Sequence, residues 1–187
     1  MDPFSIIIPV YNEADNIISL YEEIVNSIPS NINYEIIFVD DASTDNTNSL
    51  LTKLLDDKLV TTFNHKKNLG QSFSIISGIK NASYEIIVTI DGDGQNVPSD
   101  IIRLLKAYTL SKDIYLVGGI RIQRKDSLVK ILASKIANKI RSLLLNDDCL
   151  DTGCGLKVFS RKVFMKLPIL LIIWIQRVIL IIRSISI

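Results

Sequence analysis

The strongest constraint on the fold is a regular alternation of short apolar runs with amphipathic segments over the first 120 residues. The runs are rich in isoleucine and valine and do not alternate with polar residues, which is typical of strands buried on both faces of a parallel sheet. Short connections separate runs from helical segments, so the pattern predicts an α/β fold with a mostly parallel central sheet. The expected strands cover residues 4–10, 34–40, 58–63, 84–90 and 113–119.

Apolar side chains recur with helical spacing between these runs. Pro29 ends the first helical segment, and Pro98 opens the fourth at a position that suits proline. Thr44 or Asp45 is expected to cap the second segment. The expected helices cover residues 13–28, 45–56, 69–80 and 98–110. The side chains expected to face inward from the second and third helices are Leu50, Leu51, Leu54, Leu55, Phe73, Ile76 and either Ile79 or Ile75.

Two aspartates stand one residue apart directly after the fourth run, in the sequence DGDGQ at residues 91–95. A plain surface turn is one interpretation, because Asp and Gly are common turn formers. An EF-hand loop fails at Asn96 and Ile102, and a dinucleotide fingerprint fails at Val97. The alternative is a divalent-metal site, because two close carboxylates repel each other unless a cation joins them. The side chain of Gln95 could supply a further oxygen ligand.

Polar residues also follow the first two runs, at the edge of the sheet where ligands bind in such folds. Asp40 and Asp41 could serve the next helix, or hydrogen-bond a nucleobase or ribose. The sequence PVYNE at residues 9–13 could pack a turn, or hold a nucleoside with its aromatic ring and carboxylate. His65 lies in the polar loop NHKKN and is interpreted as solvated surface without a catalytic role.

Charge is distributed unevenly along the chain. Residues 1–120 carry 8 Lys/Arg against 16 Asp/Glu, and residues 121–187 carry 13 against 4. A long amphipathic helix is expected over residues 126–145, and residues 121–141 hold seven Lys/Arg and one Asp. This basic region is interpreted as a solvated face or as a phosphate site beside a membrane. Nucleic acid is not expected as a partner, because the region lacks aromatic residues for base stacking.

Two features bear on the compartment. Cys149 and Cys154 make a poor zinc site and no disulfide framework, so reduced thiols in the cytoplasm are expected. The N-terminus lacks a basic region before its apolar run, which argues against a signal peptide.

The later sequence DTGCGLKVFSR, residues 151–161, predicts a glycine-bearing loop, a short strand and the start of a helix.

Six motifs occur in this order along the chain: IIIPVYNE, EIIFVDDASTDNT, NLGQSFSIISGI, IVTIDGDGQNVPSDI, GGIRIQRKDS and DTGCGLKVFSR. Together they resemble the family 2 glycosyltransferases with the GT-A fold, over about residues 4–166. The closer resemblance is to the dolichol-phosphate mannose synthase-like, or polyprenyl-phosphate glycosyltransferase, branch. It implies a Rossmann-like sheet with helices on both faces, a GDP-mannose or UDP-sugar donor, a polyprenyl phosphate acceptor, and inversion at the sugar carbon.

The resemblance also implies roles for particular residues. The nucleotide-sugar would be held by Pro9, Tyr11, Glu13, Asp40 and Asp91. Mg²⁺ or Mn²⁺ on the donor diphosphate would be held by Asp91, Asp93 and Gln95. The acceptor phosphate would be contacted by Arg121, Lys130 and Ser134, with Asp93 and Arg121 as the catalytic residues. Lys130 stands where the family often has arginine, which keeps the charge but loses the bidentate geometry.

The acceptor implied by the resemblance agrees with elementary chemistry. Many family 2 enzymes use a Glu-Asp motif as the base for a hydroxyl acceptor, and this chain has no Glu-Asp dipeptide. A phosphate monoester has a second pKa of about 6 and is already ionised at neutral pH. A lipid phosphate is therefore expected as acceptor, with the protein peripheral on the cytoplasmic face of the membrane.

The last 21 residues depart from the family pattern. Residues 1–166 are interpreted as a GT-A domain that is incomplete at its C-terminal side, and residues 167–187 as an atypical hydrophobic tail. Gln176 and Arg177 split its apolar run, so a full membrane span is not expected. An interfacial helix, a packed terminus and an end altered by frameshift or truncation are the alternatives, and the last is favoured. The alternative function is accordingly a catalytically impaired nucleotide-sugar-binding remnant.

Overall fold

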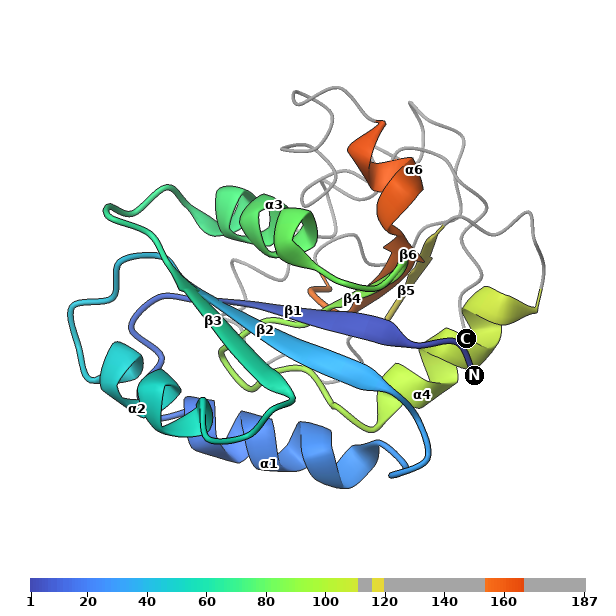
Figure 1. Ribbon diagram of the computed structural model, residues 1–187, viewed down its shortest axis with the longest axis horizontal. Coiled ribbons are helices and arrows are strands. Elements are labelled where there is room, and N and C mark those ends of the chain that lie inside the picture. Colours follow the sequence, from blue (N-terminus) through green and yellow to red (C-terminus); the bar gives the residue numbers. More distant parts are fainter. Residues whose placement is uncertain (111–115, 120–153, 167–187) are drawn as a thin grey trace, which may run out of the picture.

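The computed structural model describes residues 1–110, 116–119 and 154–166, and the structural statements below concern these residues. They form a six-stranded sheet in the order β3-β2-β1-β4-β6-β5, with helices on both faces (Figure 1). The predicted α/β fold is confirmed. The strands are β1 (Phe4–Val10), β2 (Tyr34–Asp40), β3 (Val60–Asn64), β4 (Ile86–Thr89), β5 (Leu116–Gly118) and β6 (Lys157–Ser160).

Strand directions place several strand ends at one edge of the sheet. β1 pairs in parallel with β2 and β4, and β2 pairs in parallel with β3. β6 runs antiparallel between β4 and β5. The chain order changes direction at β1, since β2 and β3 lie on one side of it and β4 on the other. The carboxyl ends of β1 and β4 therefore flank the switch point where α/β sheets bind their ligands.

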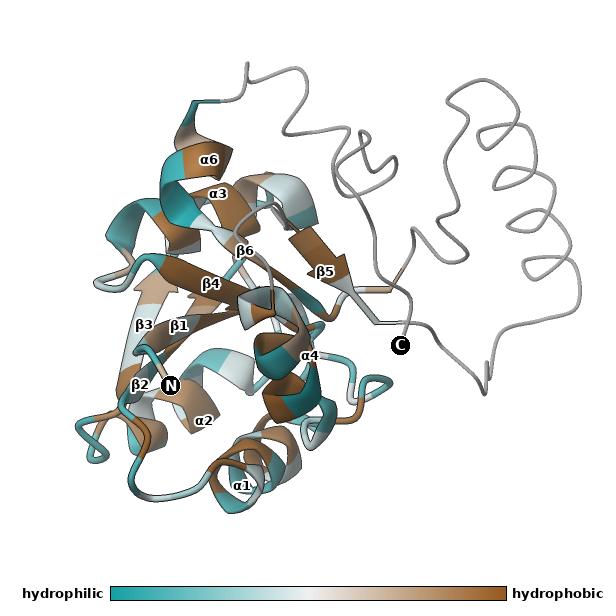
Figure 2. Ribbon diagram, turned by 90° about the vertical axis from the view of Figure 1, so that its right-hand side faces the viewer, coloured by the Kyte–Doolittle hydropathy of each residue, from teal (hydrophilic) through white to brown (hydrophobic). Residues whose placement is uncertain are grey.

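Helices cover the two faces unequally. Helices α1 (Ile17–Ser27), α2 (Thr47–Leu54) and α4 (Asp100–Thr109) lie on one face, and α3 (Gln71–Asn81) and α6 (Arg161–Met165) lie on the other (Figure 1). In Figure 2 the strands between the two layers are largely brown, and teal segments gather on the outer sides of the helices. The expected strand and helix within residues 151–161 are confirmed by β6 and α6.

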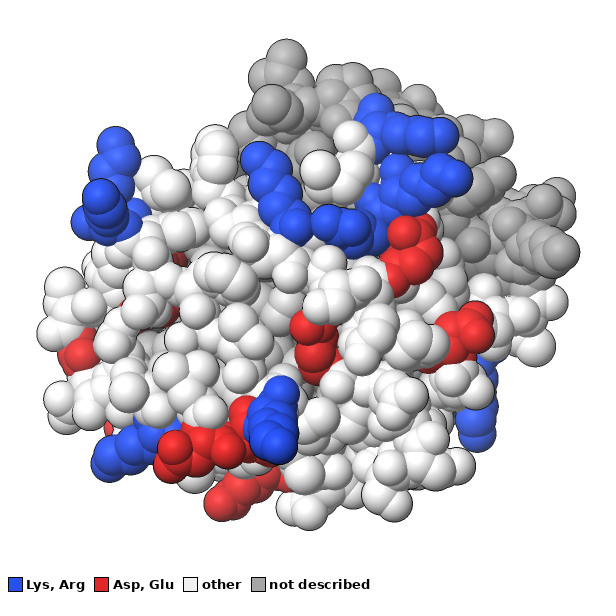
Figure 3. Space-filling view, viewed as in Figure 1, with Lys and Arg blue, Asp and Glu red and all other residues white. Residues whose placement is uncertain are grey.

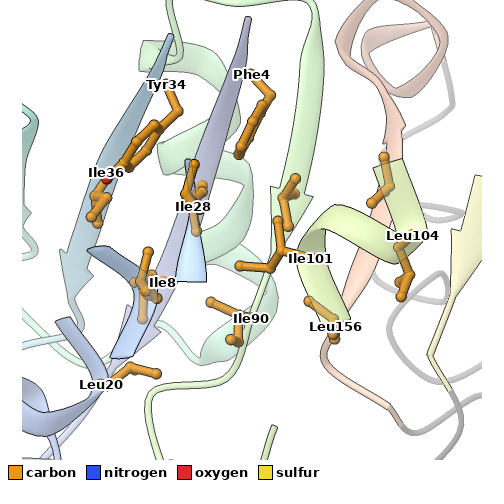
Figure 4. Close-up of a cluster of buried hydrophobic side chains, with 14 of the residues drawn as sticks. Phe4, Ile8, Leu20, Ile28, Tyr34, Ile36, Ile90, Ile101, Leu104 and Leu156 are labelled. Atoms are coloured by element: carbon orange, nitrogen blue, oxygen red, sulfur yellow. The ribbon is translucent and has the colours of Figure 1, made fainter. Parts of the chain in front are cut away.

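Side chains of β1 alternate between two hydrophobic cores. Phe4 and Ile8 belong to the core under α1 and α4, which Figure 4 shows with Leu20 and Ile101 pointing toward them. Ile7 points the other way, into the core under α3 and α6. All of these β1 side chains are fully buried. Burying each such side chain contributes about 1.5–3 kcal/mol, so the continuous apolar run is explained by a strand with two covered faces.

Two of the inward side chains predicted from helical spacing are wrong. Leu55 is 47% exposed, because α2 ends at Leu54 and Leu55 already belongs to the following turn. Phe73 is 44% exposed, because α3 turns a narrow face to the sheet. That face consists of Ser74, Ile75, Gly78 and Ile79.

Other expectations concern helix ends and the rest of the chain. The residue that directly precedes α2 is Asn46, and not Thr44 or Asp45 as expected. The carboxylate of Asp45 nevertheless accepts a hydrogen bond from the Thr47 N–H at 3.0 Å. The expected helix at 126–145 and the tail at 167–187 lie outside the described residues. Within the described part, no helix combines the length and the apolar character needed to cross a membrane.

Candidate active site

A cavity of about 350 Å³ opens at the carboxyl ends of β1, β2 and β4. Its wall is built from four segments that are distant in the sequence, namely the loops after these three strands and the start of α3. The loop after β1 contributes Pro9, Tyr11 and Glu13, and the loop after β4 contributes Asp91 and Asp93. The structure thus brings together five of the residues that the sequence analysis assigned to a nucleotide-sugar and its metal.

Hydrogen bonds between the loops after β1 and β2 fix the first part of this wall. The Asn12 N–H donates to Ser43 Oγ at 2.9 Å, and the Thr44 N–H donates back to Asn12 Oδ1 at 2.8 Å. The Glu13 N–H donates to Thr47 Oγ1 at 2.9 Å. Asn12 has a φ of 57°, a left-handed conformation that these contacts hold in place. Tyr11 and Glu13 are therefore presented at the cavity by a braced turn.

Glu13 and Tyr11 differ in how firmly they are held. Glu13 Oε2 accepts a hydrogen bond from Asn16 Nδ2 at 2.7 Å, which orients the carboxylate. Tyr11 is 45% exposed, so its ring offers an accessible aromatic face at the mouth of the cavity. An aromatic face beside an oriented carboxylate can stack a flat base and accept hydrogen bonds from hydroxyl or N–H groups.

The two adjacent aspartates after β2 have different environments. Asp40 is buried and turned into its own loop, where Oδ1 accepts from the Ser43 N–H at 2.9 Å and from Ser43 Oγ at 2.5 Å. Asp40 is not among the residues that line the cavity, whereas Asp41 is. Within the described residues, the member of this pair that lines the cavity is therefore Asp41. The nucleotide contact that the family resemblance implies for Asp40 stays a prediction.

Asp41 receives three hydrogen bonds from a single loop. Oδ1 accepts from the Leu69 N–H at 2.9 Å and from His65 Nδ1 at 2.7 Å, and Oδ2 accepts from the Gly70 N–H at 2.7 Å. Burial alone would raise the pKa of Asp41, but the hydrogen bonds from Leu69, His65 and Gly70 outweigh burial and lower this pKa below its usual value. Asp41 is thus an ionised carboxylate in the wall of the cavity.

His65 is not the solvated surface residue that its polar loop predicted. Its side chain is only 11% exposed, and both ring nitrogens are engaged. Nδ1 contacts Asp41, and Nε2 lies 2.9 Å from Ser77 Oγ on α3. The prediction was wrong because Asp41 and Ser77 lie far from His65 in the sequence, so the local sequence pattern does not indicate these contacts.

Glycines create the space for the two aspartates after β4. A Cβ on Gly155 would overlap the carboxylate of Asp91, and a Cβ on Gly92 would come within 2.9 Å of the carbonyl oxygen of Pro9. Asp91 Oδ1 accepts a hydrogen bond from Gln71 Nε2 at 2.7 Å. Asp91 is accordingly seated between the loop at Gly155 and the start of α3, with no room for a side chain at either glycine.

Asp93 and Gln95 form a local turn. Asp93 Oδ1 accepts from the Gln95 N–H at 3.0 Å, and the other Asp93 oxygen has no hydrogen-bond partner within the described part of the chain. The Gln95 side chain is exposed and does not line the cavity. The structure thus brings Asp91 and Asp93 together and leaves Gln95 outside, so a ligand role for its side chain stays a prediction.

The residues at this site fit a hard divalent cation. Asp91 and Asp93 present carboxylate oxygens to one cavity, and Mg²⁺ and Mn²⁺ prefer such ligands. Ions of this kind commonly bind through one or two carboxylates, with substrate phosphates and water as further ligands. The described residues contain no cluster of three or more His, Cys, Asp or Glu side chains that could hold a metal ion. The predicted ligand set, two carboxylates and the side chain of Gln95, does not require such a cluster.

The residues expected to contact the acceptor, Arg121, Lys130 and Ser134, lie outside the described residues. Other basic side chains of the later part of the chain are described. Arg161 and Lys162 lie on α6, Lys166 directly follows it, and Lys80 lies near the end of α3. Figure 3 shows lysine and arginine side chains gathering on this part of the surface. Arg161 is held there by donating to the carbonyl oxygens of Ile79 and Lys80.

Comparison with known proteins identifies the family. The profile of the family described as Glycosyl transferase family 2 matches residues 5–168. The chain belongs to glycosyl transferase family 2. The undecaprenyl-phosphate 4-deoxy-4-formamido-L-arabinose transferase of Yersinia pestis is 34% identical over 162 residues, and that of Proteus mirabilis is 33% identical over the same length. Both matches cover 85% of this chain and 49% of the relative. This family 2 chain thus spans about half the length of these curated relatives.

Solved structures share the GT-A fold of this family 2 chain. The glucosyl-3-phosphoglycerate synthase of Mycobacterium tuberculosis, in complex with phosphoglyceric acid, has a TM-score of 0.74 and 22% identity, covering 99% of this chain and 69% of the synthase. A mannosyltransferase of Pyrobaculum calidifontis, in complex with GDP-Man and Mn²⁺, has a TM-score of 0.62 and 20% identity, covering 87% of this chain and 46% of that protein. The expected GT-A fold and family are confirmed.

Proposed function

We propose that this chain transfers a sugar from a nucleotide-sugar to a polyprenyl phosphate, with inversion at the sugar carbon. The observation that carries the proposal is one cavity lined by Tyr11, Glu13, Asp41, Asp91 and Asp93. These residues form a nucleoside side and a diphosphate side within a space that suits a small ligand. The relatives named above supply the acceptor class, since their names refer to undecaprenyl phosphate.

On the nucleoside side, the proposed contacts are Tyr11, Glu13 and Asp41. An ionised carboxylate only accepts hydrogen bonds, so Asp41 suits the N–H groups of a base or the hydroxyls of ribose. Pro9 contributes to the wall beside Tyr11. Asp40 supports this side indirectly, because its contacts with Ser43 hold the loop that leads from Asp41 toward α2.

On the diphosphate side, Asp91 and Asp93 would hold Mg²⁺ or Mn²⁺. When bound, the ion neutralises the negative charge that develops on the leaving diphosphate. The chain's own contribution is orientation: Gln71 and Gly155 fix the position of the Asp91 carboxylate, and the turn at Gln95 fixes that of Asp93. Asp93 and Arg121 are the proposed catalytic residues, with Arg121, Lys130 and Ser134 at the acceptor phosphate.

The acceptor follows from the chemistry of the nucleophile. A phosphate monoester is ionised at neutral pH and needs no protein base, which suits a chain without a Glu-Asp dipeptide. Because the lipid tail of such an acceptor stays in the bilayer, we propose peripheral binding at the cytoplasmic face of a membrane. The basic region at residues 121–141 would meet the phosphate and the anionic lipid surface.

The test is a screen of nucleotide-sugars with polyprenyl phosphate as acceptor, with transfer measured as label in the lipid extract. We expect transfer from at least one GDP- or UDP-sugar in the presence of Mn²⁺ or Mg²⁺, and none with excess chelator. Asp93→Asn should lower transfer by at least about a hundredfold, because a charged metal ligand is lost. Asp56→Asn, which neutralises an exposed carboxylate away from the cavity, should leave transfer unchanged.

Two outcomes would contradict the proposal in different ways. Equal nucleotide binding with metal and with excess chelator would remove the metal from the donor site. Metal-dependent binding of nucleotide without transfer to any lipid phosphate would instead leave a nucleotide-sugar-binding protein, which is the alternative function.

A further inference from the structure

We propose that His65 is a positioning residue for the donor site and acts through Asp41, with Ser77 anchoring its ring. This inference deepens the proposed function, since it rests on Asp41 facing the nucleotide. The observation behind it is a continuous chain of hydrogen bonds from Ser77 Oγ to His65 Nε2 at 2.9 Å, and from His65 Nδ1 to Asp41 Oδ1 at 2.7 Å.

The protonation of the partners fixes the direction of this chain. Asp41 is ionised and can only accept, so Nδ1 of His65 carries the proton and donates it to the carboxylate. In the neutral ring Nε2 then accepts, and the Ser77 hydroxyl donates to it. The ring is held at both nitrogens, which sets its orientation and that of Asp41 together.

The same sequence of groups occurs in hydrolase triads, where the serine meets the substrate. In this protein the ligand is proposed to meet the aspartate at the other end of the hydrogen-bond chain. Asp41 lines the cavity, and Ser77 does not. Ser77 lies within α3, one turn beyond Ser74, which is the last residue of that helix in the cavity wall. The arrangement therefore orients a carboxylate and does not activate a nucleophile.

Three hydrogen bonds restrict the orientation of the Asp41 carboxylate. A carboxylate offers about four lone-pair sites, and the hydrogen bonds from Leu69, His65 and Gly70 occupy three of them. The remaining site is directed by the other three. Loss of the His65 bond would free the carboxylate to rotate, which would weaken its contact with a nucleoside.

The effect extends to the diphosphate side through neighbouring residues of one loop. The Gly70 N–H donates to Asp41, and the next residue, Gln71, donates through Nε2 to Asp91. Gly70 has a φ of 90°, so the loop turns sharply between these two contacts and α3 starts there. His65 thereby holds the segment that links the nucleoside carboxylate to the metal carboxylate.

Two substitutions of His65 separate positioning from packing. The asparagine amide nitrogen stands as many bonds from Cβ as Nδ1 does, so His65→Asn retains the donor to Asp41. The glutamine amide nitrogen matches Nε2 in position, so His65→Gln retains a hydrogen bond with Ser77, in which the hydroxyl now accepts, and loses the donor to Asp41. Both replacements are neutral amides, and they differ mainly in whether the hydrogen bond to Asp41 or the one to Ser77 is kept.

The experiment measures binding of UDP and GDP with Mn²⁺ to the full chain by calorimetry. We expect His65→Gln to weaken binding about tenfold or more, as for loss of a hydrogen bond to a charged group, and His65→Asn to stay within about threefold of the wild type. In an Asp41→Asn background the two variants should bind alike. Asn64→Ala changes the exposed neighbouring residue and should have no effect. Equal affinities of the two His65 variants would overturn the proposal.

A second measurement does not depend on nucleotide binding. Amide hydrogen exchange at Leu69 and Gly70 should accelerate in His65→Gln and stay slow in His65→Asn, because both amides donate to the carboxylate that His65 orients. If the wild type binds neither nucleotide, the proposed function fails while exchange still decides the role of His65. Equal exchange in both variants would then refute that role.

Discussion

At the scale of single residues, the site depends on a glycine that carries no chemistry. The carboxylate of Asp91 occupies the space that a Cβ on Gly155 would fill, although the two residues belong to different strand ends. Thr89 Oγ1 also donates to the carbonyl oxygen of Gly155 at 2.7 Å, which ties this loop to β4. The position of the Asp91 carboxylate, a proposed metal ligand, is thereby set by backbone from a remote part of the chain.

Gly155→Ala tests this dependence. The added methyl group should displace the Asp91 carboxylate and weaken Mn²⁺-dependent binding of UDP or GDP by at least about tenfold, as measured by calorimetry. Gly118→Ala is the matched control, because a Cβ at Gly118 meets no atom within 4 Å. Unchanged binding in Gly155→Ala would show that Asp91 does not need its present position.

Asp41 provides a prediction about pH. Its pKa in the folded chain lies below the ordinary value of 3.8, so the ionised carboxylate stabilises the fold above about pH 4, and this stabilisation is lost as the pH falls through the folded pKa. Wild type should exceed Asp41→Asn in unfolding free energy by about 1–3 kcal/mol near pH 6. Urea denaturation should show this difference shrinking toward about pH 2. A difference that is independent of pH would contradict the assignment.

At the scale of elements, sequence patterns locate strands better than helix faces. β1 and β2 begin and end at the bounds predicted from their apolar runs, because burial on both faces leaves few polar positions within them. The first helix begins at Ile17 and not at residue 13, because residues 13–16 are drawn into the braced turn beside the cavity. The face of α3 was mispredicted at Phe73 because two small residues, Ser74 and Gly78, share the sheet-facing side with Ile75 and Ile79.

Gly78 is the small residue that sets this approach. A Cβ there would overlap the Cγ2 methyl group of Ile7 in β1. Alanine normally favours a helix by about 0.5–1 kcal/mol over glycine, but Ile7 is β-branched and fully buried and has little freedom to move. Gly78→Ala should therefore lower the unfolding free energy by about 1–3 kcal/mol in urea denaturation. A stabilised variant would mean that α3 can move away from the sheet.

At the scale of the whole molecule, the sequence predicted the fold class and the edge that carries the site, and it assigned Tyr11, Glu13, Asp91 and Asp93 to that site. It did not predict the place of β6, which inserts antiparallel between β4 and β5. It also missed the contacts of His65, since these join the loops after β3 and β2 to α3, across 24 and 12 residues of sequence. Local periodicity encodes which face of an element is buried, and it contains no information about such long-range hydrogen bonds.

A ligand that binds only the folded chain should stabilise the whole molecule. UDP or GDP with Mn²⁺, at a concentration about 100 times Kd, should add about 2.7 kcal/mol. For a chain of 187 residues this corresponds to a rise in Tm of about 5–10 °C. Thermal unfolding with and without chelator measures it. The same rise in the presence of chelator would show that nucleotide binds without the metal.

The inserted strand β6 has a consequence for biosynthesis. Because β6 separates β4 from β5, the sheet keeps an open edge at β4 until a segment 66 residues farther along the chain has left the ribosome. The same segment contains Gly155, against which the carboxylate of Asp91 packs. A nascent chain can therefore complete the part of the cavity wall formed by the loops after β1 and β2 first, and the position of the Asp91 carboxylate is fixed only when translation has passed Gly155.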